Sequence, residues 1–478
     1  MKYKPTIGME VHVELATESK MFCACKNELG LDRIPNTNIC PVCTGQPGAL
    51  PAANEKAIEF VIKAGLALGC EIAKVSKFDR KNYFYPDLPK GYQISQYDQP
   101  LCLGGSLEIG GKKIGITRIH LEEDTGKLIH QKGNDFSLVD FNRSGVPLME
   151  LVTEPDIESA EEAKKFCEQL QIILRYIGIS DADMEKGQMR CEANISVSTN
   201  GELGTKVEVK NLNSFKVVEK AIEYEIKRQA ELLDEGGRIA QETRGWDESK
   251  MVTFSQREKE SAHDYRYFPE PDLPPLEIGE GYVEKIKDEL PELPAAKVKR
   301  FIEEYKISEY DALLLTRDKK LAEFFEEAVS EGQEEAKEPE KIAKLTANYI
   351  LTEIKKYLDE KTTIGGLKAT AKDFGELMRI VSDGRINSSA AQIVLSNMLE
   401  TGASPERIVA EKDLGQIEDE SEIENIVRDV VSQNPGPAED FKKGKQSALQ
   451  FLLGQTMKKT KGRVNPKTAA DLLKRYLT

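Results

Sequence analysis

The chain opens with a run in which apolar and polar residues alternate. Ile7, Met9, Val11 and Val13 take the odd positions, and acidic residues and a histidine fill the even ones from 10 to 14. A period of two is typical of a β-strand with one buried face. The same pattern predicts strands at residues 6–15, 112–121, 189–198 and 205–212.

Segments with helical spacing lie between these runs. They cover residues 54–68, 159–176 and 216–233. Asn54 is a candidate N-cap for the first of them, and Gly69 is a candidate stop signal. Antiparallel strands with a few interspersed helices predict an α+β domain.

The pattern changes after a proline-rich stretch at residues 267–282. From Pro291 onward apolar residues recur at helical spacing, which predicts helices at 295–306, 319–330, 340–360 and 371–384. A further break falls at residues 402–405. We therefore expect an α+β domain at 1–292, a helical domain at 293–405 and a small all-α tail domain at 406–478, in line with the roughly 150 residues of a typical domain.

Charge separates within the predicted tail. The 478 residues have a formal net charge of −15, which by itself argues against a polyanionic partner. Residues 406–440 carry 11 acidic and three basic side chains, whereas residues 441–478 carry ten basic and one acidic. The basic segment fits contact with nucleic-acid phosphates. The alternative is a solvated basic face that balances the acidic block before it.

Two further features of the sequence bear on where in the cell we expect the protein. No apolar run is long enough for a transmembrane helix, and the N-terminus lacks the apolar core and cleavage site of a signal peptide. We expect a cytoplasmic protein without membrane contact. Its eight cysteines are then thiols or metal ligands rather than disulfides.

Four of the cysteines form two close pairs. Cys23 and Cys25 precede Cys40 and Cys43, and the second pair lies in the turn sequence CPVCTGQPG. Four thiolates suit tetrahedral Zn²⁺ and leave no open position, so the spacing predicts a structural zinc site. Unrelated thiols and an iron–sulfur cluster are the alternatives. The remaining cysteines, without such spacing, are expected to be packing residues: Cys70, Cys102, Cys167 and Cys191.

Acidic residues and a histidine share the polar face of the first strand. Glu10, His12 and Glu14 point together there, and three consecutive acids follow at 122–124. Such side chains suit Mg²⁺ or Mn²⁺. A solvated strand face is the alternative. Strict alternation from Ile119 would place Glu122 and Asp124 opposite Glu123, so the choice among the three acids stays open.

The segment RKNYFYPDLPKGYQISQY mixes cations with aromatic rings. This composition fits phosphate contact and base stacking, or an aromatic loop packed on the core. The cations are Arg80, Lys81 and Lys90, and the rings include Tyr83, Phe84, Tyr85 and Tyr92. The chain has neither a P-loop nor a G-x-G-x-x-G motif, so a nucleotide must be held in another way.

Several long strings occur in one order along the chain. They are IGMEVHVEL, the cysteine pairs, RKNYFYPDLPKGYQISQY, HLEEDTGK, DFNRSGVPLMELVTEPD, KGQMRCEANISV, VEVKNLNSF and DYRYFPEPDLPPL. Together they span almost all of the first 275 residues. The chain closely resembles the GatB family, the B-type subunits of the heterotrimeric aspartyl/glutamyl-tRNA amidotransferase (GatCAB). Its helical remainder resembles that family's helical and YqeY-like tail domains.

The resemblance implies a fold and an activity. The fold is a cradle-like catalytic α+β domain with a mixed or antiparallel sheet, then an all-α domain and an all-α tail that binds tRNA. The activity is an ATP-dependent ligase reaction that amidates misacylated Glu-tRNA(Gln), Asp-tRNA(Asn) or both. The implied partners are the A-type glutaminase subunit, which supplies ammonia, the small C-type subunit and the misacylated tRNA. The implied cofactors are ATP, Mg²⁺ or Mn²⁺ and a structural Zn²⁺.

The resemblance also assigns residues. Glu10, His12, Glu123 and Glu150 match the catalytic magnesium site, with Asp124 as second choice to Glu123. Tyr83, Lys90 and Arg143 are the expected contacts to substrate or nucleotide. The zinc-bearing members of the family match the chain at Cys23, Cys25, Cys40 and Cys43.

Two other functions fit parts of the sequence. A non-enzymatic RNA-binding adaptor would explain the basic tail but not the clustered acids. A stand-alone metal-dependent hydrolase would explain the acids and would work without partner subunits.

Overall fold

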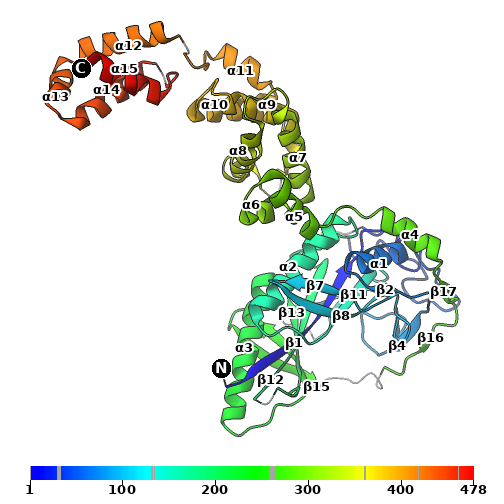
Figure 1. Cartoon of the computed structure of the whole chain (residues 1–478). Helices are drawn as coiled ribbons and strands as arrows, with labels where there is room; N and C mark the ends of the chain where they lie inside the picture. Colours follow the sequence, from blue (N-terminus) through cyan, green and yellow to red (C-terminus); the bar gives the residue numbers. More distant parts are fainter. Residues whose placement is uncertain are drawn as a thin grey trace. The chain divides into compact units, whose positions relative to one another are not determined.

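The chain divides into two compact units, residues 1–293 and 294–478. The computed structural model describes residues 2–28, 34–130, 133, 135–199, 201–258, 265–359, 362–417, 419–460 and 462–477. The first unit holds a large β-sheet with helices, and the second is helical (Figure 1). This confirms the fold class predicted from the sequence.

A mixed sheet forms the frame of the first unit. Its described strands follow the order β15-β14-β13-β12-β1-β11-β8-β6-β2, with β7 also paired to β8. Neighbouring strands are antiparallel except for β13 and β14, which run parallel. The strands of this sheet are β1 (Lys4–Glu14), β2 (Glu71–Ile72), β6 (Cys102–Leu103), β7 (Ser106–Ile109), β8 (Lys112–Glu123), β11 (Pro147–Thr153), β12 (Met189–Ser198), β13 (Val207–Leu212), β14 (Glu242–Asp247) and β15 (Val252–Glu258).

Three smaller sheets complete the described β-structure. They pair β9 (Lys127–His130) with β10 (Ser137–Asp140), β3 (Val75–Ser76) with β17 (Leu276–Glu277), and β4 (Asp79–Asn82) with both β5 (Tyr92–Ser95) and β16 (Phe268–Pro269). The last of these sheets joins the predicted aromatic segment to the stretch around Phe268. Segments far apart in the sequence thus become neighbours.

Three of the four described helices of the first unit begin at a residue whose side chain caps the helix. The four helices are α1 (Glu55–Ala67), α2 (Ala160–Tyr176), α3 (Phe215–Asp234) and α4 (Glu280–Asp288). Asn54 accepts hydrogen bonds from the backbone N–H groups of Lys56 and Ala57, which confirms it as an N-cap. Gly69 follows the end of α1 with φ of +71°, a conformation that suits glycine.

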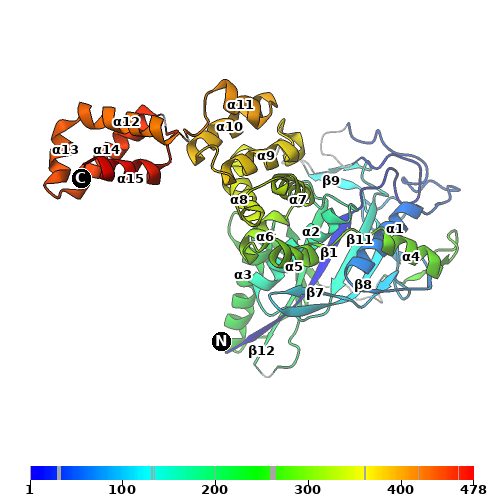
Figure 2. The same cartoon turned by 45° about the horizontal axis from the view of Figure 1, so that its top comes forward.

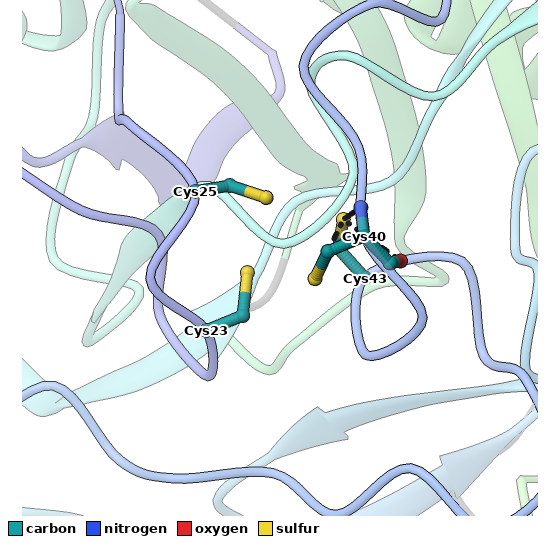
Figure 3. A group of neighbouring side chains, drawn as sticks. All are labelled: Cys23, Cys25, Cys40 and Cys43. Carbon is teal, nitrogen blue, oxygen red and sulfur yellow. Dashed lines mark hydrogen bonds between the residues drawn. The ribbon is translucent and has the colours of Figure 1, made fainter.

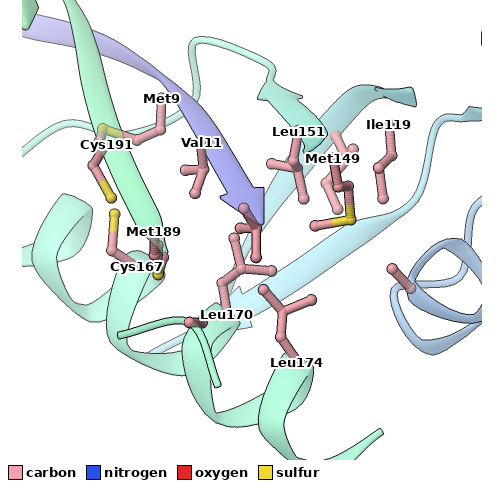
Figure 4. Close-up of a cluster of buried hydrophobic side chains, with 14 of the residues drawn as sticks. Met9, Val11, Ile119, Met149, Leu151, Cys167, Leu170, Leu174, Met189 and Cys191 are labelled. Atoms are coloured by element: carbon pink, nitrogen blue, oxygen red, sulfur yellow. The ribbon is translucent and has the colours of Figure 1, made fainter. Parts of the chain in front are cut away.

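One face of the large sheet is apolar and packs against α1, α2 and α3. Val11 and Leu151 from the strands share a buried core with Leu170 and Leu174 of α2 (Figure 4). The four cysteines without paired spacing also lie in this core, as predicted: Cys70, Cys102, Cys167 and Cys191. Burial of one sheet face leaves the opposite face for polar side chains.

The second unit contains two clusters of buried apolar residues. The first draws on residues 301–408 and the second on residues 423–477. The helices are α5 (Pro294–Tyr305), α6 (Glu309–Leu315), α7 (Lys319–Gln333), α8 (Pro339–Thr352), α9 (Ala371–Ser382), α10 (Ser388–Thr401), α11 (Pro405–Glu411), α12 (Glu420–Gln433), α13 (Pro435–Lys442), α14 (Gln446–Lys459) and α15 (Pro466–Leu477), with 3₁₀ turns η1 (Ile354–Tyr357) and η2 (Ile364–Gly366). Figure 2 shows α12 to α15 gathered together.

The predicted helix at 340–360 is shorter in the structure. α8 ends at Thr352, and a 3₁₀ turn follows from Ile354. The hydroxyl of Thr352 donates to the carbonyl oxygen of Asn348 at 2.7 Å, a contact that often bends or weakens a helix. Glu360, the last residue of the prediction, lies outside the described residues.

Candidate functional site

Strand register gathers the charged side chains of the sheet's polar face. In β1, His12 lies opposite Glu150 of β11, and Glu150 in turn lies opposite His120 of β8. On the other side of β1, Glu10 lies opposite Glu192 of β12. Directly opposed residues have neighbouring side chains. The register therefore builds one polar cluster from four strands.

His12 lies at the centre of this cluster. Its Nε2 is 3.4 Å from Glu150 Oε2, 3.6 Å from Glu122 Oε1 and 3.8 Å from Glu10 Oε1. His120 Nε2 approaches the same Glu150 oxygen at 3.3 Å. The sequence-based set of Glu10, His12 and Glu150 is thus brought together, and His120 and Glu122 join it.

Burial and close charges shift the pKa values within the cluster. Burial, with the negative charges of Glu150 and Glu192, raises the pKa of Glu10 to about 7. Burial opposes the charged form of His12, but its hydrogen bond with Glu150 and the nearby carboxylates raise its pKa to about 9. Burial also opposes ionisation of Glu150, yet His120 and His12 hold its pKa well below the ordinary value. The cluster thus favours positive charge at its centre.

Glu123 and Asp124 lie apart from these residues. Glu123 forms an ion pair with Lys90 and accepts the backbone N–H of Ile94 at 3.0 Å. Asp124 lies 2.8 Å from Arg190 Nη2. The reason is the pleat of β8: Ile119 and Leu121 enter the core, so His120 and Glu122 face the cluster and Glu123 points away. The structure therefore places Glu122 in the cluster and the expected Glu123 and Asp124 outside it.

The three expected substrate contacts have partners within the chain. Lys90 pairs with Glu123. Tyr83 donates to Gln93 Oε1 at 3.4 Å. Arg143 donates to the carbonyl oxygens of Thr125 and Gly126 at 3.0 and 2.8 Å. The cations that line the cleft beside the acidic cluster are other residues of the first unit.

A cleft of about 320 Å³ opens beside the acidic cluster. Among its lining residues are Glu10, His120 and Glu150 together with four cations, Lys81, Arg118, Lys206 and Lys210. Lys81 Nζ lies 5.0 Å from the centre of the Tyr265 ring, and Tyr97 stacks on Tyr267 at 4.2 Å. Of these cations the sequence motifs indicated only Lys81. The alternation in TKVEVKNL could have identified Lys206 and Lys210, because it puts them on one face of the predicted strand.

Lys210 neutralises a second group of acids. Its Nζ lies 2.8 Å from Glu192 and 3.9 Å from Glu208, which adjoin Glu10. Burial opposes the charge on Lys210, but these carboxylates raise its pKa above the ordinary value. The cleft therefore carries an ammonium group on one side of Glu10 and the histidines on the other.

The donor set around His12 fits a divalent cation. The ligand atoms of Glu10, His12 and Glu150 lie within 4.8 Å of one another, as do those of His120, Glu122 and Glu150. His120 Nδ1 is buried without a hydrogen-bond partner among the described residues. Carboxylate oxygens with an imidazole nitrogen are suitable ligands for Mg²⁺ or Mn²⁺. Within the described residues, the sulfur atoms of the paired cysteines form a separate candidate metal site.

The paired cysteines converge from two loops. The sulfur atoms of Cys23, Cys25, Cys40 and Cys43 lie within 4.8 Å of one another, and Figure 3 shows the two pairs facing each other. The backbone N–H of Cys40 donates to Cys43 Sγ at 3.1 Å. Hydrogen bonding from Cys23 is the main cause that lowers the pKa of Cys43, to about 4. Four close sulfurs and a backbone donor fit tetrahedral Zn²⁺.

The cysteine loop also borders the Lys90–Glu123 pair. A Cβ atom at Gly45 would lie 2.6 Å from Lys90 Cγ, so only glycine allows this close approach. Ser144 Oγ donates to the carbonyl oxygen of Cys43 at 2.8 Å. The loop is thus packed against the end of β8 and the turn before β11.

Comparison with known proteins identifies the class of domain. Residues 5–284 match the model of the GatB/GatE catalytic domain, and residues 323–477 match the model of the GatB domain. Among the described helices, none is both long and apolar enough to cross a lipid bilayer.

Full-length relatives identify the family more closely. The chain is 52% identical to the aspartyl/glutamyl-tRNA(Asn/Gln) amidotransferase B subunit of Caldanaerobacter subterraneus subsp. tengcongensis, with 100% of both chains covered. It is 51% identical to that of Carboxydothermus hydrogenoformans, over 99% of this chain and 98% of the relative, and 50% identical to that of Persephonella marina, over 100% of both. The chain belongs to the GatB family, the B subunits of the aspartyl/glutamyl-tRNA(Asn/Gln) amidotransferases.

The placement of Glu122 and Glu123 predicts different effects on cation binding. Glu122→Gln should weaken Mn²⁺ binding about 10–100-fold, because it removes a charged oxygen beside His12. Glu123→Gln is the matched control and should leave binding nearly unchanged, since Glu123 faces Lys90. Mn²⁺ titration followed by electron paramagnetic resonance measures both. A larger loss in the Glu123 variant would contradict the assignment.

Proposed function

We propose that this chain is the amidating subunit of a glutamine-dependent ligase acting on misacylated tRNA. It converts Glu-tRNA(Gln) to Gln-tRNA(Gln), Asp-tRNA(Asn) to Asn-tRNA(Asn), or both. An A-type glutaminase subunit supplies ammonia, and the small C-type subunit completes the heterotrimer. Membership of the GatB family supports this proposal, and the cleft supplies its chemical basis.

The cleft beside His12 is the observation on which the proposal depends. A carboxylate resists amidation because its leaving group would be oxide, so ATP first converts the side-chain carboxylate to an acyl phosphate. Ammonia then displaces phosphate and forms the amide. Both substrates are anionic at the reacting atoms, which calls for nearby positive charge. Lys81, Arg118 and Lys210 line the same cleft and can neutralise phosphate oxygens.

Within this proposal Glu10, His12, Glu122 and Glu150 hold Mg²⁺ or Mn²⁺, with His120 beside them. The bound ion supplies positive charge that offsets the negative charge of the γ-phosphate and the reacting carboxylate. Lys210 stays on the opposite side of Glu10, where Glu192 orients its ammonium group. Lys81 lies beside the Tyr265 ring and lines the cleft together with the acids. These side chains hold ATP and the aminoacyl carboxylate in one place.

Reconstitution with the glutaminase and C-type subunits tests this function. The complex should amidate misacylated tRNA in the presence of ATP, Mg²⁺ and glutamine. Glu10→Gln should reduce tRNA-dependent ATP cleavage by about 10²-fold or more, because it weakens the hold on the cation. Glutamine hydrolysis by the glutaminase, measured without tRNA, should persist. Glu18→Gln, an exposed acid shortly after β1, is the control and should retain activity.

Other outcomes would favour the alternative functions. A complex that binds tRNA but never consumes ATP would indicate an RNA-binding adaptor. Hydrolysis of amides or phosphate esters by the isolated chain would indicate a stand-alone hydrolase. A Glu10→Gln complex that amidates tRNA at the normal rate would contradict the site assignment.

We also propose that the four paired cysteines bind one structural Zn²⁺. Cys40→Ser should lower the zinc content and the thermal midpoint, since it removes one of four ligands. Residual activity should keep a similar KM for ATP, because the thiols lie outside the ATP cleft. Metal analysis of chain purified without chelator measures the content. Wild-type chain without zinc would contradict the proposal.

The tail at residues 406–478 is the proposed tRNA-binding domain. Several of its cations already pair with acids: Lys443 with Glu439, Lys445 with Asp440, Lys459 with Asp429 and Arg475 with Glu420. Lys442, Lys458 and Lys467 are exposed and form no ion pair with the described residues. Lys461, also in the basic segment, lies outside the described residues. The unpaired lysines are the best candidates for phosphate contact.

Replacing these three lysines tests the tail without removing its core. Converting Lys442, Lys458 and Lys467 to Gln should weaken tRNA binding and flatten its logarithmic salt dependence by about 0.9 for each phosphate that is no longer neutralised. The matched control converts Lys443, Lys445 and Lys474, which have acidic partners, and should have a smaller effect. Binding is measured against salt for the assembled complex. Equal affinity and slope in wild type and the first variant would indicate a solvated face.

A further inference from the structure

A lysine lies completely buried beside the cysteine cluster. Lys20 has 0% of its surface exposed, although a lysine is rarely buried without a partner. Its Nζ donates to the carbonyl oxygen of Asn38 at 3.0 Å and lies 3.7 Å from Cys43 Sγ. Neither described partner is a carboxylate. The ammonium group therefore depends on the sulfur cluster for negative charge.

The backbone fixes this lysine at the cluster. The N–H of Lys20 donates to the carbonyl oxygen of Cys25 at 2.9 Å, and the N–H of Met21 donates to that of Gly145 at 2.7 Å. A Cβ atom on Gly145 would lie 3.6 Å from Lys20 Cδ, so the turn before β11 confines the lysine stem. These backbone hydrogen bonds and the contact with the turn hold the Lys20 side chain against Cys43.

Charge balance explains why a cation is placed there. Four thiolates around Zn²⁺ carry a formal charge of −2. A buried ammonium group is unfavourable in a low-dielectric interior unless a nearby negative charge offsets it. Beside a zinc–thiolate centre Lys20 gains a charge-assisted hydrogen bond to Cys43 Sγ. The lysine thus favours the zinc-bound form, in which the sulfur cluster carries its largest negative charge.

We propose that Lys20 is the built-in countercharge of the cysteine cluster and strengthens its hold on Zn²⁺ through a hydrogen bond to Cys43. The inference rests on the zinc site proposed above. Lys20 acts as a positioning residue, since it binds a ligand and not the metal itself. The four cysteines alone would form a weaker zinc site.

Two measurements on the full-length chain test this role. The first is zinc affinity by competition with a chromogenic chelator, and the second is the thermal midpoint with and without zinc. Lys20→Met should weaken zinc binding about 10–100-fold, the usual effect of losing a partner of a metal ligand. The fall in the thermal midpoint should be larger with zinc than without it, because the zinc–thiolate centre carries the larger negative charge beside Lys20. Lys20→Arg, which keeps the charge, should retain more affinity than Lys20→Met.

The control is Lys26→Met, which removes an exposed lysine from the same loop and should leave zinc affinity unchanged. A purely structural Lys20 would give a different result: Lys20→Met would lower the midpoint equally with and without zinc and keep the wild-type affinity. That outcome would overturn the inference. If the methionine variant does not fold, Lys20→Gln provides the same comparison, with the same two outcomes.

Different results would contradict the zinc site and the proposed role of Lys20. Wild-type chain that neither carries nor takes up zinc would contradict the site, and the inference with it. Wild-type chain that binds one zinc, with equal affinity in Lys20→Met, would contradict only the countercharge.

Discussion

The antiparallel register of β1 between β11 and β12 is the constraint on which the rest of the first unit depends. It places His12 opposite Glu150 and Glu10 opposite Glu192, while Val11 enters the core between them. A slip by one residue would exchange the two faces of the strand. Such a slip would bury the charged residues of β1 against the apolar faces of the helices and expose its valines. Hydrophobic burial therefore also fixes the positions of the acids.

The same constraint accounts for the electrostatics of the cleft. Acids from neighbouring strands are forced close together, and burial makes their repulsion costly. Histidines on one side of Glu10 and Lys210 on the other offset this repulsion between the acids. Such a balance suits a site that accepts a cation and anionic substrates. A fully neutralised cluster would have little tendency to bind a cation or an anionic substrate.

The cysteine cluster shows a related use of buried charge. Its loop packs against the Lys90–Glu123 pair through Gly45 and against the turn before β11 through Ser144. A centre that stabilises this loop would also stabilise the rim of the catalytic unit. The buried Lys20 ties the same turn to Cys43, so metal binding and local folding become linked.

The sequence by itself determined four strands of the large sheet, seven of the helices and the spacing of the paired cysteines, because periodicity and spacing are local properties. It also placed Glu10 and His12 on one face, since alternation within a strand needs no partner. It did not determine whether Glu122 or Glu123 joins them, because that depends on how β8 is seated against the core. Lys206 and Lys210 reach the cleft only through pairing of β13 with β12, and Lys20 meets Cys43 only after loop closure. Contacts between distant segments arise from packing, so only the tertiary structure decided them.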